Sequence, residues 1–159
     1  MTCDPLRPDW EYVADTVMGG VSAGRITPIS QDGRAGMRLT GTVSLENNGG
    51  FIQMAFDPDP SAQSYDASAF DAISFDTRGN GATYAVSLRT TELSRPWHSY
   101  RGTFETRTAW QRVRIPFAEF APSNTDIPLN RAKLRRIGII AVGRAFDVDV
   151  SVANLCFSG

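Results

Sequence analysis

The stretch Ser44-Leu45-Glu46-Asn47-Asn48-Gly49-Gly50-Phe51 interrupts two apolar runs and marks a change in chain direction. Two glycines behind two asparagines can adopt the left-handed dihedrals that a tight reversal requires. An upstream stretch, Asp15-Thr16-Val17-Met18-Gly19-Gly20-Val21-Ser22, has a second glycine pair between an acid and a hydroxyl that can bond to backbone amides. We call these stretches the 44–51 motif and the 15–22 motif, and they predict two glycine-dependent bends.

The rest of the chain reads as all-β. From residue 25 onward the hydrophobic period is two, and short β-rich runs are separated by Gly, Pro, Asn and Asp. About nine strands are enough for two antiparallel sheets. The predicted strands are 25–30, 37–45, 51–56, 70–77, 83–90, 99–106, 110–115, 134–142 and 147–156.

Three connecting segments are also predictable. The proline-bearing segment 57–68 cannot supply a full ladder of donors and should be a surface excursion, and 121–131 is similar. Residues 115–120 fit one short helical turn, because Pro116 is tolerated at its start and Phe117 and Phe120 can pin it to the sheets.

The motifs resemble those of the complex I intermediate-associated protein family. The resemblance spans about residues 10–157 and includes further segments at 79–84, 100–104, 110–120 and 136–140. It implies a jelly-roll-like β-sandwich of the galactose-binding type. It also implies a non-catalytic role in assembly, with a protein partner such as subunits or assembly intermediates of respiratory complex I.

One strand predicts a possible contact surface. Val113 and Ile115 fall on its core face, so Trp110 should share the outer face with Arg112 and Arg114. Such an aromatic beside two guanidiniums can contact a partner.

The same outer face has a simpler interpretation. Arg89 and Arg101 belong to it if their strands share the sheet. Alternatively it is a solvated face on which an arginine pairs across strands with Asp76 or Glu105.

The motif residues have two interpretations as well. They satisfy backbone amides in two bends, or the bends lie together at one end of the sandwich and present a shallow site to a partner. The partner-binding candidates are Asp15, Met18, Gly19, Gly20, Ser22, Glu46, Asn47, Asn48, Gly49, Gly50, Trp110, Arg112 and Arg114.

Length and charge exclude several classes. The 159 residues fit one domain, residues 1–159, that buries about 70% of its unfolded surface. A formal charge of −1 offers no bulk attraction to nucleic acid. No stretch approaches the roughly 20 apolar residues that span a bilayer, and the start lacks signal or transit features, so we expect a cytoplasmic protein.

The two cysteines, Cys3 and Cys156, lie near opposite ends of the chain. The first and last strands of a sandwich can be neighbours, so a disulfide is geometrically possible. A reducing compartment favours free thiols, which we therefore expect.

Catalytic chemistry is poorly represented. The one histidine, His98, shares strand parity with Tyr100 and Phe104, which favours a packed ring over a general base. One His and two distant Cys fall short of zinc-ligand spacing, and neither glycine pair forms the G-x-G-x-x-G phosphate pattern. We predict no enzyme, no cofactor and no metal.

A binding module of another class is the alternative. Galactose-binding-like sandwiches often hold sugars on aromatic platforms, and Trp97, Tyr100 and Trp110 can supply one. The sequence therefore predicts a protein-binding domain, with a carbohydrate-binding β-sandwich as the alternative.

Overall fold

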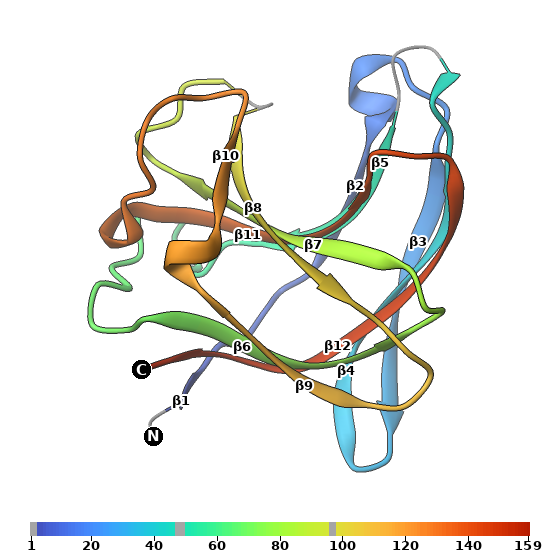
Figure 1. Cartoon of the computed structure of the whole chain (residues 1–159), viewed down its shortest axis with the longest axis horizontal. Helices are drawn as coiled ribbons and strands as arrows, with labels where there is room; N and C mark the ends of the chain where they lie inside the picture. Colours follow the sequence, from blue (N-terminus) through green and yellow to red (C-terminus); the bar gives the residue numbers. More distant parts are fainter. Residues whose placement is uncertain (1–2, 47–49, 96–97) are drawn as a thin grey trace.

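The computed structural model describes residues 3–46, 50–95 and 98–159, and at positions 17 and 18 it describes the backbone only. Two six-stranded sheets face each other (Figure 1). Sheet A runs in the order β3 (Ala23–Gln31), β4 (Arg34–Val43), β12 (Phe146–Ser158), β6 (Ala72–Gly79), β9 (Gln111–Pro116), and β1 (Cys3–Pro5) also pairs with β12. Sheet B runs in the order β10 (Ala121–Ser123), β8 (Ser99–Glu105), β7 (Thr83–Thr90), β11 (Leu134–Val142), β5 (Phe51–Phe56), β2 (Glu11–Ala14).

The predicted class is confirmed, because every neighbouring strand pair in both sheets is antiparallel. All nine predicted strands are present, and β5, β7 and β11 have the predicted bounds. The prediction missed β1, β2 and β10, which have only three or four residues each. Such short strands carry too little alternation to be recognised, and β10 lies at a sheet edge, where its proline is tolerated.

Alternation builds the core as expected. On β7 the side chains of Tyr84, Val86 and Leu88 are buried between the sheets, and on β12 Val148 and Val150 are buried too. The predicted helical turn is the 3-10 turn η3 (Phe117–Glu119), which follows Pro116 and buries Phe117.

Sheet B is curved. In Figure 1 its β10–β8 end and its β5–β2 end rise on either side of β7 and β11, so the sheet bends. The face of sheet B that points away from sheet A is therefore concave, and we call it the concave face. The two motif bends lie at the β5–β2 end of this face.

The 44–51 motif is a crossover between sheets. Strand β4 before it belongs to sheet A and β5 after it belongs to sheet B, so the motif connects the two sheets and does not close a hairpin within one sheet. Of the motif, Asn47, Asn48 and Gly49 lie outside the described residues. The remaining residues meet the 15–22 motif at one buried side chain, Asp15.

The Asp15 carboxylate joins the two motifs. It opens the 3-10 turn η1 (Asp15–Met18) and is completely inaccessible to solvent. Its Oδ2 accepts hydrogen bonds from the Gly50 N–H (2.6 Å) and the Phe51 N–H (3.2 Å). Ser22 donates to both oxygens, with its N–H on Oδ1 (3.1 Å) and its hydroxyl on Oδ2 (2.5 Å). Four donors therefore satisfy one buried charge, as burial of a carboxylate requires.

Ser22 extends this network to the end of β4. Its hydroxyl oxygen also accepts a hydrogen bond from the Ser44 N–H (2.8 Å). The carboxylate and this hydroxyl together fix the start and the end of the crossover relative to η1.

The glycines of the motifs serve different purposes. Gly19 ends η1 with φ of 87°, and Gly50 has φ of 146°, so both use the left-handed half of the map as expected. Gly20 does not, and the expectation of a left-handed dihedral there is wrong. It is needed for space instead, because a Cβ on Gly20 would lie 2.5 Å from the Asp15 carboxyl carbon.

The termini are linked. The structure joins Cys3 and Cys156 in a disulfide with a Cα–Cα distance of 5.5 Å, so the expectation of free thiols is wrong. The pairing of β1 with β12 brings these residues together, since Pro5 is the register partner of Cys156. The pairing is not visible in the sequence, because β1 has only three residues.

Replacing the central carboxylate tests the network. We expect Asp15→Asn to lower the free energy of unfolding by about 3 kcal/mol, since each buried donor left unsatisfied costs about 1–3 kcal/mol. Chemical denaturation measures this loss. Asp66→Asn is the matched control, because Asp66 accepts the same pair of bonds from the N–H and hydroxyl of Ser68 but is exposed. An equal loss in both variants would contradict the assignment.

The network also predicts an acid limb of stability. Burial raises the pKa of the Asp15 carboxyl, but hydrogen bonds from Ser22, Gly50 and Phe51 outweigh burial and hold that pKa below its ordinary value. This stabilisation is present above the unfolded pKa of about 3.9 and is lost as the pH falls through the folded pKa. Denaturation at a series of acidic pH values should show a shallower pH dependence for Asp15→Asn than for the wild type.

The two glycines of the 15–22 motif should differ in sensitivity. Gly19→Ala places an alanine at positive φ in open space and should cost about 1–2 kcal/mol. Gly20→Ala drives a Cβ into the Asp15 carboxylate and should cost more than Gly19→Ala in the same thermal melts. The reverse order would show that dihedral strain, not close approach, governs this bend.

Removing the disulfide should destabilise the chain. The bridge joins residues 153 apart in sequence, and we expect Cys3→Ser with Cys156→Ser to cost about 2–4 kcal/mol through the gain of entropy in the unfolded chain. Reductant should lower the melting temperature of the wild type and leave that of the double variant unchanged. A titration of two free thiols in the untreated native protein would contradict the disulfide.

Candidate functional site

The motif residues predicted as a contact site divide into buried and surface positions. Asp15, Gly20 and Ser22 are buried in the network described above, which gives them a structural role. Gly19 and Glu46 are exposed, and the Glu46 N–H bonds to the Ser44 hydroxyl (3.2 Å). The Met18 side chain is not described. The bends do lie together, so their surface residues remain candidates for one rim of a site.

The outer face of sheet A holds Trp110, Arg112 and Arg114, but Arg112 is already engaged. It donates to Asp76 Oδ1 (3.3 Å), to the Asn154 carbonyl (3.0 Å) and to the Cys156 sulfur (3.1 Å). Register explains the first contact, because Asp76 lies directly opposite Arg112 in the β6–β9 pair. This is the cross-strand pair that the simpler interpretation predicts.

Asp76 gathers further partners on this face. It accepts hydrogen bonds from Arg34 (3.2 Å) and from the Asn154 side chain (2.8 Å). Burial raises the pKa of the Asp76 carboxyl, but the hydrogen bonds from Asn154 and Arg112 outweigh it and hold the pKa below its ordinary value. Arg34 also lies 5.3 Å from the centre of the Trp110 ring, as in a cation–π contact. Arg34 and Arg112 on this face therefore share one carboxylate, that of Asp76.

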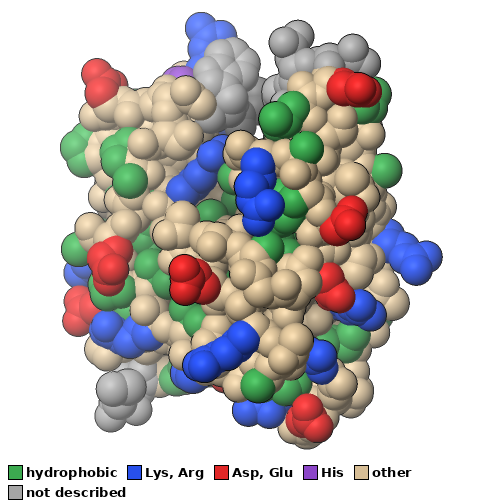
Figure 2. All heavy atoms as spheres, turned by 45° about the vertical axis from the view of Figure 1, so that its right-hand side comes forward, with side chains coloured by type: hydrophobic (Ala, Val, Ile, Leu, Met, Phe, Trp, Pro, Cys, Tyr) green, Lys and Arg blue, Asp and Glu red, His purple; other side chains and the backbone are tan. Residues whose placement is uncertain are grey.

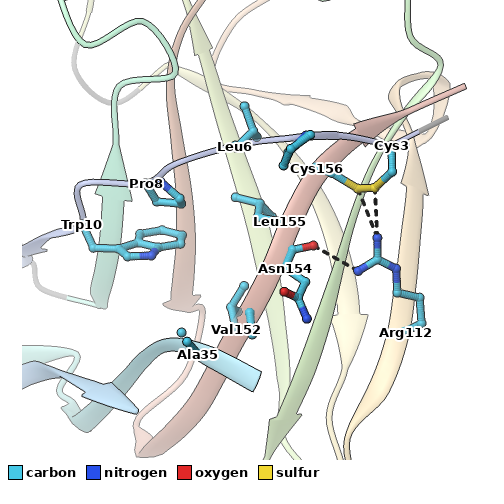
Figure 3. Close-up of a pocket in the computed structure, with 13 residues that line it drawn as sticks. Cys3, Leu6, Pro8, Trp10, Ala35, Arg112, Val152, Asn154, Leu155 and Cys156 are labelled. Carbon is cyan, nitrogen blue, oxygen red and sulfur yellow. Dashed lines mark hydrogen bonds between the residues drawn. A yellow bond between two sulfur atoms is a disulfide. The ribbon is translucent and has the colours of Figure 1, made fainter. Parts of the chain in front are cut away.

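A cavity of about 320 Å³ lies beside this cluster (Figure 3). It occupies the gap along β12 between the start of β4 and the end of β1, at the bulge that follows Ala153. Leu6, Trp10 and Leu155 line it, and Figure 3 shows Arg112 pointing toward the disulfide. The side chains of Arg112 and Asn154 also line the cavity, and both already form hydrogen bonds within the protein.

Arg89 and Arg101 do not join this surface. They lie on β7 and β8 of sheet B, whereas Arg112 and Arg114 lie on β9 of sheet A, so the shared-surface interpretation is wrong. Parity places both on the concave face, because Tyr84, Leu88 and Tyr100 fill the core from the alternate positions.

The concave face has a floor of small residues. The register aligns Arg101 with Ser87, Ser87 with Gly138, and Gly138 with Ala55 across four strands. Although they point away from the core, Ser87 is only 8% exposed and Ala55 only 1%. A Cβ on Gly138 would lie 2.6 Å from Gln53 Oε1, so the Gln53 side chain crosses above this glycine. In Figure 2 a hollow on the surface contains Lys or Arg side chains with hydrophobic side chains beside them.

Charge is distributed unevenly across this face. Toward β5 and β2, Arg136 pairs with both Asp57 and Glu11, and Arg135 also bonds to Asp57 (2.6 Å). Toward β7, Arg89 donates to the backbone carbonyls of His98 (3.1 Å) and Arg95 (2.8 Å) rather than to a carboxylate. One half of the face is thus neutralised and the other is cationic.

Arg101 is the extreme case. Its side chain is half-buried, yet it forms no ion pair with any residue that the structure describes, and its buried Nε finds no hydrogen-bond acceptor there. Burial lowers the pKa of the Arg101 guanidinium, and burial followed by the charge of Arg135 lowers that of Arg89. Perturbed groups of this kind mark candidate functional sites.

The aromatic platform proposed from the sequence is not assembled. Tyr100 is completely buried, with its hydroxyl bonded to the Ile127 carbonyl (2.7 Å), and Trp110 belongs to the outer face of sheet A. Trp97 lies outside the described residues. Within those residues no cluster of three or more His, Cys, Asp or Glu is placed to hold a metal ion, and no helix has the length and hydrophobicity to cross a membrane.

Solved structures share the fold over the whole chain. The family 11 carbohydrate-binding module of Clostridium thermocellum, in complex with a β-1,3-1,4-mixed-linked tetrasaccharide, covers 100% of this chain and 97% of its own, with TM-score 0.77 and 14% identity. The family 30 module of a C. thermocellum cellulosomal cellulase covers 100% and 98%, with TM-score 0.69 and 14% identity. An exo-β-agarase matches with 24% of its chain against 96% of this one, with TM-score 0.58 and 11% identity. At these identities the likeness shows a galactose-binding-like β-sandwich and nothing more.

The family of the chain is identified from its sequence. No curated protein sequence matches the chain significantly. The model of complex I intermediate-associated protein 30 (CIA30) matches residues 4–151, a span that includes both motifs and the Asp15 network between them. The chain therefore belongs to the CIA30 family.

Proposed function

We propose that this chain is a non-catalytic, assembly-factor-like domain that binds a protein partner through the concave face of sheet B. The observation that carries the proposal is the half-buried Arg101, which has no ion-pair partner among the described residues and lies beside a floor of small residues on an outward face. Loops on a rigid sheet scaffold often add recognition, and the exposed residues of the two motifs form one rim of this face. Membership of the CIA30 family supports subunits or assembly intermediates of respiratory complex I as the partner.

The cytoplasmic location stays a prediction. The Cys3–Cys156 disulfide argues against it, because such bridges persist where thiols are not kept reduced. The choice of extract for any search for a partner should follow the location established by cell fractionation.

Blocking the concave face tests this function. Ser87→Tyr adds a ring above the floor without entering the core, and we expect tagged protein with this change to lose the complex I proteins that the wild type captures from native extract. Mass spectrometry of the captured proteins measures the loss, and thermal melting checks that the variant stays folded.

The control places the same ring on the opposite side. Arg114→Tyr changes an exposed residue on the outer face of sheet A and should retain every partner. Loss of the partner by the Arg114 variant alone would move the site to the Trp110, Arg112 and Arg114 face. Specific capture of no complex I protein by the wild type would contradict the assembly role itself.

Carbohydrate binding is the second candidate, favoured by the chain-wide fold likeness to two carbohydrate-binding modules. The chemical support for carbohydrate binding is weaker, because Tyr100 is buried in the core and cannot contribute its ring to the proposed aromatic platform. Affinity electrophoresis in gels containing mixed-linked β-glucan would decide between them, because retardation that Ser87→Tyr abolishes favours the sugar.

A further inference from the structure

The β8–β7 half of the concave face presents positive charge to a ligand. Arg101 is flanked on one side by Ser87 and on the other by Ala121, its register partner on β10. Neither neighbour carries a long side chain, and Arg101 itself is only partly buried, so part of its side chain faces solvent.

An unpaired, half-buried guanidinium is costly for the free protein. Partial burial removes solvation from a charge, and elsewhere in this chain such groups are compensated. Arg136, which is also partly buried, pairs with Asp57 and Glu11, and the partly buried Arg135 bonds to Asp57 (2.6 Å). Arg101 has no such carboxylate among the described residues, so a ligand that supplies one compensates it.

Arg89 provides a second, oriented guanidinium. Its bonds to the His98 and Arg95 carbonyls use Nε and Nη2, and within the described part of the chain no bond from Nη1 is found. Its register partner is Arg136, a like charge, which also favours an anion above this position. Guanidinium forks match the planar, two-oxygen geometry of carboxylates.

The spacing of the two arginines selects the arrangement of carboxylates. Ser87 lies opposite Arg101 and Arg89 is two residues further along β7, so the two arginines are diagonal neighbours on one face. Diagonal positions in antiparallel strands are about 7–8 Å apart. In an extended peptide, side chains at i and i+2 share a face and lie about 6.7 Å apart.

We propose that the β8–β7 half of the concave face binds an extended acidic segment of the protein partner, whose carboxylates at positions i and i+2 pair with Arg101 and Arg89. The inference rests on the proposed function and names the chemistry of the partner. An acidic polysaccharide is the competing anionic ligand, and it is an outcome of the test.

Peptides of matched composition test the spacing. Fluorescence anisotropy should show that the full chain binds labelled Ser-Thr-Glu-Thr-Glu-Thr-Ser more tightly than Ser-Thr-Glu-Glu-Thr-Thr-Ser, in which adjacent carboxylates point to opposite faces. The Gln-Thr-Gln version should not bind, and added salt should weaken binding of the first peptide. Equal binding of the two acidic peptides, or binding of the glutamine version, would overturn the inference.

Variants assign the binding to Arg101. Arg101→Gln should weaken binding of the alternating peptide by about 10-fold or more, as loss of a charge-assisted bond does. Arg101→Lys should restore it only in part, because an ammonium lacks the fork, and Arg114→Gln on sheet A should change nothing. Unchanged affinity in Arg101→Gln would contradict the proposal. If that variant unfolds, an affinity of Arg101→Lys equal to that of the wild type would contradict it instead.

The last arm separates this inference from the function on which it rests. Binding of polygalacturonate, dependent on Arg101, without binding of either acidic peptide would assign the face to a carbohydrate and overturn the inference. Failure of all these ligands, while Ser87→Tyr still abolishes partner capture, would overturn the acidic segment and leave the proposed function standing.

Discussion

The buried carboxylate of Asp15 is the constraint on which the sandwich depends at its crossover end. The chain must pass from β4 in sheet A to β5 in sheet B, and the amides of Gly50 and Phe51 at the end of that passage need acceptors. One carboxylate supplies them, and it can remain ionised without solvent because Ser22 donates twice more. The distinctive motif sequence follows from this need, since Gly20 leaves the space that the carboxylate occupies.

The residues that define the family are therefore different from those that we propose to recognise a partner. The most recognisable letters of the chain, the acid and glycines of the 15–22 motif, are used in holding two sheets together. The arginines of the outer faces divide by the same criterion, because Arg112 is satisfied within the protein whereas Arg101 is not. A charge left unsatisfied by its own fold is better evidence for a ligand than a recognisable motif is.

How much of the structure can be predicted from the sequence depends on how many neighbouring residues each sequence pattern involves. Alternation is local, so the strands of residues 51–56, 83–90 and 134–142 are predicted to the residue, and the helical turn predicted at 115–120 is present as the shorter turn Phe117–Glu119. Strand order is not local. The alternation in the sequence shows that Arg89 and Arg101 point outward, but it does not show that their strands lie in sheet B and not beside the strand of Arg112 in sheet A. The disulfide and the three shortest strands depend on neighbours far along the chain, which no short window contains. The low exposure of Ser87 and Ala55 on an outward face is equally absent from local pattern.

The fold shared with carbohydrate-binding modules fixes a scaffold, and the composition of the concave face decides what that scaffold binds. On β8 the alternation that turns the Tyr100 ring into the core turns Arg101 outward, and a shift of one residue would exchange their places. The same register that completes the core thus removes an aromatic ring from the concave face and supplies a guanidinium instead. The ligand preference of the concave face therefore follows from the packing of the core. Because β8 buries Tyr100 and Phe104, only the residues at its alternate positions can face outward.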